Sequence, residues 1–184
     1  MIAEPDPAAQ TALLVPVPAA EPAVGRHRRS LDPSAGWGVP AHVTVLFPFL
    51  PPSLVSDSVV ARIEQTLRGV PAFDFALDRT EWFGDQVVWL APEPDEPFRR
   101  LIRTLSDAFP ECPPYGGAYD EQVPHLTIGQ RSDDAALAAL QVAAASVATC
   151  LPLRTTADTI LLMTGRREPL SWRTAHTFPL TRSP

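Results

Sequence analysis

Two of the four histidines in this 184-residue chain stand two residues before a threonine. His42 precedes Thr44 in the segment PAHVTVLFPF, and His125 precedes Thr127 in the segment PHLTIG. Side chains at positions i and i+2 of a β-strand point to the same face, so each imidazole would lie beside a hydroxyl. Because an imidazole titrates near neutral pH, it can serve as a general acid or a general base. The two motifs therefore predict a site that gathers two imidazoles and two hydroxyls.

The elements that would position these side chains form a repeated order. Apolar alternation predicts strands over 11–17, 41–49, 73–79, 86–91, 123–130, 151–155, 159–164 and 174–180, and helical spacing predicts helices over 21–31, 53–68, 95–109 and 132–148. A strand, a helix and two strands thus follow one another twice, beginning at residues 41 and 123. Between the motif residues, Val43, Val45, Leu126 and Ile128 would face a core.

This order of elements predicts an α+β fold with two lobes related by a pseudo-twofold axis. We expect antiparallel sheets that flank a central cleft, within one two-lobed domain over residues 1–184. The lobe with the first motif would span about 36–92 and the lobe with the second motif about 120–165. The N-terminal and C-terminal strands would complete the sheets.

The composition limits the kinds of molecule that the protein could bind. The formal net charge is −6, and all 15 cationic side chains are arginines. An acidic chain of this kind lacks the broad basic surface of a protein that tracks along duplex nucleic acid. If it handles nucleic acid, we expect a nucleotide or a strand end as its partner. The acidic first ten residues do not resemble a signal peptide, and the apolar run 135–151 is too short and too polar to span a membrane.

The cysteines and the glycines exclude several other kinds of site. Cys112 and Cys150 show neither a CxxC spacing nor a metal-ligand pattern, which predicts reduced thiols in a cytosolic protein. No carboxylate cluster stands beside the histidine motifs, so we expect neither a metal nor a cofactor. The sequence contains no GxSxG motif and no phosphate-binding glycine pattern, which disfavours a serine hydrolase and a Rossmann or P-loop site.

The two motifs resemble those of the two-histidine phosphoesterase superfamily, which contains the RNA 2′,3′-cyclic phosphodiesterases, also called 2′-5′ RNA ligase-like proteins. The segments 40–49 and 124–129 carry the resemblance. It is supported by TALLVPVP at 11–18, FPECPPY at 109–115, and the final strand with Trp172 and 178–180. The absence of lysine and the acidic balance depart from what a binder of long RNA would show.

The resemblance implies a metal-independent phosphodiesterase that opens 2′,3′-cyclic phosphates at RNA or nucleotide ends to 2′-phosphates, with 2′-5′ RNA ligation as a further activity. His42 and His125 would be the catalytic residues, and the family's usual assignment makes His42 the acid and His125 the base. The sequence by itself does not order them. Thr44 and Thr127 would bind the phosphate oxygens. The protein would be a cytoplasmic monomer that binds no membrane.

Three readings stay open on the sequence. The chain is either such an enzyme or a non-catalytic module that binds nucleotides or RNA ends on the same fold. A phosphodiesterase for another 2′-linked or cyclic nucleotide is the third reading. Intact histidines and threonines in both motifs favour an enzyme.

Several other side chains are weaker candidates, each with a structural alternative. Arg131 could reach a phosphate, although a solvated surface arginine is the favoured reading. Stacking on a base competes with packing or loop anchoring at three aromatic residues: Trp37, Tyr115 and Tyr119. The basic cluster of Arg26, His27, Arg28 and Arg29 could guide a phosphorylated substrate, but a solvated helix face is favoured. His27 and His176 carry no motif and are expected to be structural or exposed.

Overall fold

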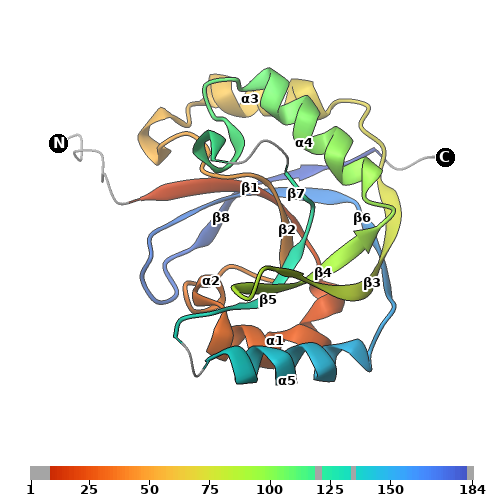
Figure 1. Cartoon of the computed structure of the whole chain (residues 1–184). Coiled ribbons are helices and arrows are strands. Elements are labelled where there is room, and N and C mark those ends of the chain that lie inside the picture. Colours follow the sequence, from red (N-terminus) through yellow and green to blue (C-terminus); the bar gives the residue numbers. More distant parts are fainter. Residues whose placement is uncertain (1–8, 119–121, 134–135, 182–184) are drawn as a thin grey trace.

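The computed structural model describes residues 9–118, 122–133 and 136–181 (Figure 1). Within these residues the chain forms two four-stranded antiparallel sheets. Sheet 1 has the order β2-β1-β7-β8, formed by β1 (Gln10–Pro16), β2 (His42–Leu46), β7 (Thr159–Gly165) and β8 (Arg173–Pro179). Sheet 2 has the order β5-β4-β3-β6, formed by β3 (Phe73–Phe83), β4 (Val87–Glu93), β5 (Leu126–Gln130) and β6 (Leu153–Ala157). The α+β class with two antiparallel sheets is thereby confirmed.

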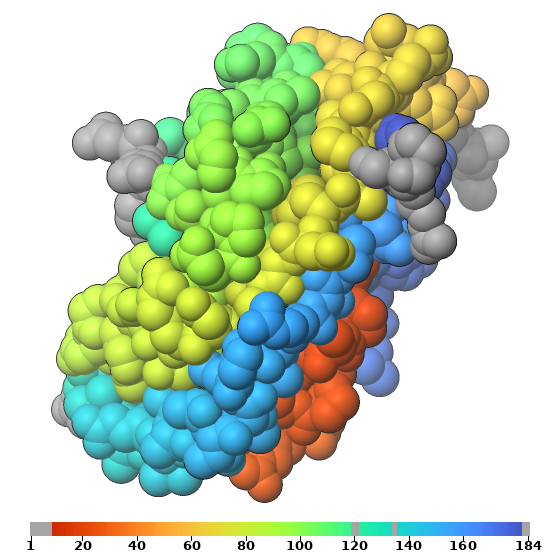
Figure 2. Space-filling model, turned by 90° about the vertical axis from the view of Figure 1, so that its right-hand side faces the viewer, coloured from red at the N-terminus to blue at the C-terminus, as the bar shows by residue number. Residues whose placement is uncertain are grey.

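The helices cover the two sheets in pairs. They are α1 (Glu21–Leu31), α2 (Pro33–Gly36), α3 (Asp57–Leu67), α4 (Glu96–Ala108) and α5 (Ala136–Ala148), with short 3₁₀ turns η1 (Pro18–Ala20), η2 (Pro52–Leu54) and η3 (Pro114–Gly117). Helix α4 packs on β2 and beside α3, whereas α1 packs on β5 and beside α5 (Figure 1). Figure 2 shows α1 and η1 in orange next to the blue segment that contains β6, so early and late parts of the chain share one face.

The expected division into lobes of residues 36–92 and 120–165 does not follow the sheets. The first range supplies β2 to sheet 1 but β3 and β4 to sheet 2, and the second supplies β5 and β6 to sheet 2 but β7 to sheet 1. The repeat instead begins one strand earlier, as β1-α1-β2 and as β4-α4-β5. In each unit, two strands that pair in antiparallel fashion stand before and after a helix in the chain. The second of these strands belongs to a histidine motif and lies at the edge of its sheet. The local pattern could not show this, because β1 pairs with β7 across most of the chain.

Two predicted helices begin later than expected. Residues 52–54 form a separate 3₁₀ turn, and α3 starts at Asp57, where the Ser56 hydroxyl accepts a bond from the N–H of Val59 at 3.4 Å. The last predicted helix, over 132–148, is described from Ala136, whose N–H donates to Asp133 Oδ1 at 2.9 Å. Residues 134–135 lie outside the described residues. Helix α4 buries an apolar stripe formed by Phe98, Leu101, Ile102 and Leu105.

The core lies between the sheets and their covering helices. The inward residues of the motif strands, Val43, Val45, Leu126 and Ile128, are fully buried, as their alternation predicts.

No helix in the described part of the chain is long and apolar enough to cross a membrane.

Gly129 tests how closely the helices approach the second motif strand. A Cβ at this position would lie 2.6 Å from Leu31 Cβ and 2.8 Å from Leu140 Cδ2, so α1 and α5 would have to move. We expect Gly129→Ala to lower the free energy of unfolding by about 1–3 kcal/mol, measured by urea denaturation. Gly36→Ala is the matched control, because its Cβ would meet no atom within 4 Å. Equal stability of the two variants would contradict the close approach.

Candidate active site

The two motifs occupy equivalent places in the fold. His42 is the first residue of β2, and His125 directly precedes β5. Both histidines and both threonines are partly buried, while the residues between them are buried in the core. His42 and Thr44 therefore share one face of sheet 1, and His125 and Thr127 share one face of sheet 2.

The structure brings the two motif strands together. Strand β2 lies against β5, although they belong to different sheets (Figure 1). The Gln122 amide donates to the carbonyl oxygen of Val45 at 3.4 Å, which ties the segment before β5 to β2. His125 lies near enough to His42 that its charge lowers the pKa of His42. The two imidazoles are thus close enough for the charge of one to affect the protonation of the other.

The same hydrogen bond orients both rings. Nδ1 of His42 lies 2.7 Å from the carbonyl oxygen of Pro40, and Nδ1 of His125 lies 2.8 Å from that of Val123. A carbonyl can only accept, so Nδ1 carries the proton and donates it in both rings. The Nε2 atom of each neutral ring then keeps its lone pair and can take a proton, and in the charged ring it can give one.

Burial makes both rings harder to protonate in the free protein. Burial chiefly lowers the pKa of His42 to about 4, with the charge of Arg28 as the next cause, while the bond to Pro40 and the charge of Asp32 oppose the shift. Burial also lowers the pKa of His125, against the opposing bond to Val123. A phosphate placed between the rings would favour their charged forms, because its negative charge attracts imidazolium.

An aromatic wall, formed by Phe83 and Trp89, stands beside the second histidine. The ring of Phe83 lies edge-on to that of His125 with centroids 5.1 Å apart, and it stacks on Trp89 at 4.8 Å. Trp89 is the direct cross-strand neighbour of Thr127, so it lies on the face that carries the motif. Phe83 is 37% exposed, which leaves part of its ring accessible. Neither residue is among the candidates that the sequence predicts, although Trp89 falls on a predicted strand.

The face of sheet 1 that carries Thr44 holds a small apolar cluster. Leu14 stands directly opposite Thr44 and packs with Val39, Met163 and Trp172. Trp37 packs against this cluster, with the guanidinium of Arg167 5.9 Å above its ring, which supports packing as its role.

Of the remaining candidates, Arg131 lies away from the motifs, Tyr115 is bonded to the segment that contains the first motif, and Tyr119 is outside the described residues. Arg131 forms an ion pair with Asp85 of the β3–β4 turn and lines a cavity of about 290 Å³ with Arg29, at the opposite end of β5 from His125. The backbone N–H of Tyr115 donates to the carbonyl of Phe47 at 2.6 Å, whereas Tyr119 lies outside the described residues.

The basic cluster separates into different environments. Arg26 donates to His27 and to Ser146 of α5, and Arg29 is exposed. Arg28, in contrast, is 2% exposed, so the expected solvated helix face is wrong for this residue. Arg28 lies one helical turn after Val24, which is also buried, and this spacing in the sequence indicates that both side chains face the core. His176 is exposed on β8 beside Phe178.

The described residues contain no group of three or more His, Cys, Asp or Glu side chains that could hold a metal ion. Both cysteines are free thiols, with Cys112 buried and Cys150 exposed.

Comparison with known proteins identifies relatives of the whole fold. Residues 15–169 match the model of the 2′-5′ RNA ligase superfamily. TT0787 of Thermus thermophilus has a TM-score of 0.66 at 19% identity, covering 93% of this chain and 97% of that one. LigT of E. coli has a TM-score of 0.57 in complexes with 3′-AMP (19% identity, 95% and 99% covered) and with ATP (18% identity, 94% and 98% covered). No curated protein matches the chain.

The lowered pKa of His42 makes the stability of the protein depend on pH. Between about pH 4 and pH 6.5 the unfolded chain binds a proton at this residue that the folded chain does not, so the free energy of unfolding rises with pH across this window. We expect His42 to contribute at most about 3 kcal/mol to this rise. His42→Asn keeps a donor in the place of Nδ1 and should flatten the slope in urea denaturation between pH 4.5 and 7. The exposed His176→Asn is the control, and parallel profiles for His42→Asn and the parent would contradict the shift.

Proposed function

The chain belongs to the 2′-5′ RNA ligase superfamily, and we propose that within it the protein is a metal-independent 2′,3′-cyclic phosphodiesterase. Its substrates are cyclic phosphates at nucleotide or RNA ends, and its products are 2′-phosphates. The observation that carries the proposal is the matched pair of motifs on neighbouring strands, with both histidines held through Nδ1. The nucleotide complexes of LigT support a nucleotide as the ligand class.

Two histidines with free Nε2 atoms can perform both proton transfers of ring opening. A water molecule attacks phosphorus, and Nε2 of His125 takes its proton. The bond from phosphorus to O3′ breaks in line with the attack, and Nε2 of protonated His42 gives its proton to O3′. The product keeps the phosphate on O2′ and gains a 3′-hydroxyl. If the 5′-hydroxyl of another strand replaces water, the same steps leave a 2′-5′ linkage.

The threonines and the aromatic wall have complementary tasks in this proposal. The hydroxyls of Thr44 and Thr127 donate to the non-bridging phosphate oxygens, where charge must be stabilised. The exposed part of the Phe83 ring offers a platform on which a nucleobase stacks next to His125. The base would thereby be held on the side of sheet 2.

The proposal extends to the state of the protein. It acts as a monomer in the cytoplasm, where the free thiols of Cys112 and Cys150 would stay reduced. The non-catalytic binding module is the second candidate, because a site built from the same residues could bind a nucleotide without turning it over. Turnover separates the two.

Replacing either histidine should abolish most of the turnover. We expect His42→Ala and His125→Ala each to lower kcat by about 10²–10⁴-fold on a 2′,3′-cyclic mononucleotide, because each removes a placed acid or base. Thr44→Ala and Thr127→Ala should cost less, since water partly replaces a neutral donor. The assay follows product by chromatography with phosphate position assigned by ³¹P NMR, and circular dichroism verifies folding.

The same assay includes EDTA, which should leave the rate of the parent protein unchanged. Loss of turnover with EDTA and its return with a divalent ion would contradict the two-histidine scheme. Binding of the cyclic nucleotide without any product in the parent protein would favour the binding module instead.

Removing the Phe83 ring from the aromatic wall should weaken substrate binding rather than slow the chemical step. We expect Phe83→Ala to raise KM for a cyclic nucleotide by about tenfold, in the range of one lost base–aromatic stack. The value of kcat should change by less than about threefold, because Phe83 gives no proton. Val142→Ala, which truncates an exposed apolar side chain on α5, is the control. Unchanged KM for Phe83→Ala would remove Phe83 from the substrate site.

A further inference from the structure

Arg28 is a buried cation on α1. Its Nε and Nη2 atoms donate to Asp32 Oδ2 at 3.0 and 2.9 Å, and Nη2 also lies 3.2 Å from the Ser34 hydroxyl. Both Arg28 and Asp32 are nearly inaccessible to solvent, at 2% and 4% exposure. Burying an ion pair costs more than a hydrophobic contact of the same size, so this pair calls for a role besides stability.

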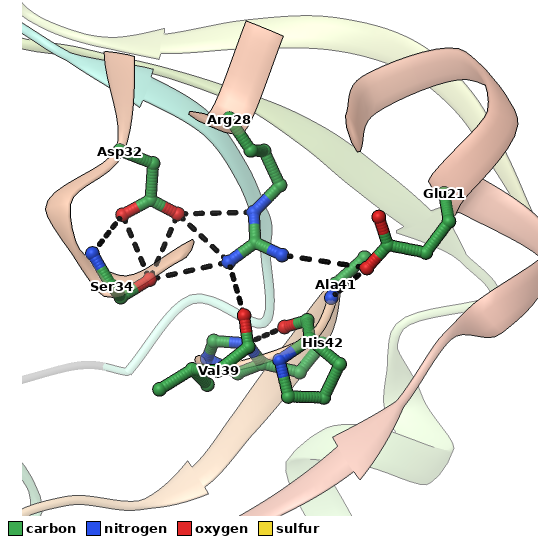
Figure 3. A network of polar contacts seen from close by, with 8 residues as sticks. Glu21, Arg28, Asp32, Ser34, Val39, Ala41 and His42 are labelled. Carbon is green, nitrogen blue, oxygen red and sulfur yellow. Dashed lines mark hydrogen bonds and ion pairs between the residues drawn. The ribbon is translucent and has the colours of Figure 1, made fainter. Parts of the chain in front are cut away.

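The pair is connected to the backbone that leads into His42 (Figure 3). Arg28 Nη2 donates to the carbonyl of Val39 at 3.3 Å. The N–H of Ala41 donates to Glu21 Oε1 at 2.7 Å, and that oxygen lies 3.8 Å from Arg28 Nη1. Between these two anchors, the carbonyl of Pro40 accepts the bond from Nδ1 of His42. The three residues before His42 are therefore each held by a polar contact.

We propose that Arg28, with Asp32 and Glu21, is a positioning residue for His42 that fixes the ring through residues 39–41 and places a permanent positive charge behind it. The three side chains constitute the clamp. The inference rests on the proposed function for what His42 does in the reaction, but the clamp itself acts on the ring in the absence of substrate.

The charges around His42 indicate what the clamp changes. Arg28 and Asp32 face it from the side of α1, Glu21 contacts the adjacent Ala41, and His125 faces it from the segment just before β5. The charge of Arg28 lowers the pKa of His42 and outweighs the opposite effect of Asp32. A lower pKa makes the imidazolium a stronger proton donor once the negative phosphate keeps it charged. The clamp therefore makes the proton-donor role of His42 depend on the bound phosphate.

The second histidine has different surroundings. Burial lowers the pKa of His125 and the bond to Val123 opposes this shift, and the ring contacts Phe83 and Trp89 rather than a charged pair. The two motifs thus share the backbone hydrogen bond that orients the ring, but the charges around the two rings differ. Removing the clamp should consequently affect His42 more than His125.

The first test measures the ring directly. In Arg28→Met/Asp32→Asn the ion pair becomes a neutral pair, and the Asn oxygen still accepts from Ser34 as Asp32 does. NMR titration of histidine-labelled protein should show the pKa of His42 raised by about half a unit or more, with a smaller change at His125. Arg28→Lys keeps the charge and should keep the low pKa. A folded Arg28→Met/Asp32→Asn protein with the parent's His42 titration would overturn the proposal.

The second test separates position from charge and does not disturb the buried pair. Glu21 is partly exposed, and Glu21→Ala removes the acceptor for the Ala41 N–H, whereas Glu21→Gln keeps an oxygen there. On a 2′,3′-cyclic nucleotide, Glu21→Ala should lower kcat by about tenfold with KM within about threefold, and Glu21→Gln should recover most of the loss. Equal kcat for Glu21→Ala and the parent, with unchanged ring ¹⁵N shifts of His42, would overturn the clamp even if the double variant does not fold.

The outcomes also separate the clamp from the proposed function. If the parent protein turns over no cyclic phosphate, the proposed function fails, and the NMR titration still decides the clamp. A raised pKa of His42 in Arg28→Met/Asp32→Asn supports it, and an unchanged pKa overturns it.

Discussion

The contact between β2 and β5 is the constraint on which the proposed site depends. In the described part of the chain each is the outermost strand of its own sheet, and the two meet across the junction between the sheets. Each is covered by the helix of the other unit, with α4 on β2 and α1 on β5. Because the helices are exchanged in this way, separating the motifs would expose core on both sides. The main core thus sets the spacing of the histidines.

The two histidines have similar backbones and dissimilar surroundings, which would suit the two proton transfers of the proposed reaction. The shared Nδ1 bond gives both rings the same tautomer, which leaves both Nε2 atoms available. The neighbours then differ, with a buried arginine behind His42 and aromatic rings beside His125. Pairs of titratable groups whose environments separate their pKa values are typical of sites that need one donor and one acceptor.

Local pattern was enough for the motif strands, because alternation alone places Val43 and Leu126 in the core and the threonines beside the histidines. The family came instead from the resemblance of the two motif segments to a known superfamily. It did not show which sheet each strand joins, since pairing of β1 with β7 depends on residues far apart in the chain. Nor did it identify Arg28 as a buried partner of Asp32, because composition favours a solvated arginine. Phe83 lies beyond the end of the predicted strand 73–79, and only the folded hairpin brings its ring to His125.

The pairing of β1 with β7 has a consequence for how the protein is made. Strand β2 is joined to sheet 1 through β1 alone, and the other side of β1 is filled by β7, which is translated long after β1. A ribosome therefore releases the first histidine strand long before its sheet can close. Until β7 emerges, β1 presents an unpaired edge of the kind that invites association with other chains. The nascent protein would be a candidate for chaperone binding during this interval.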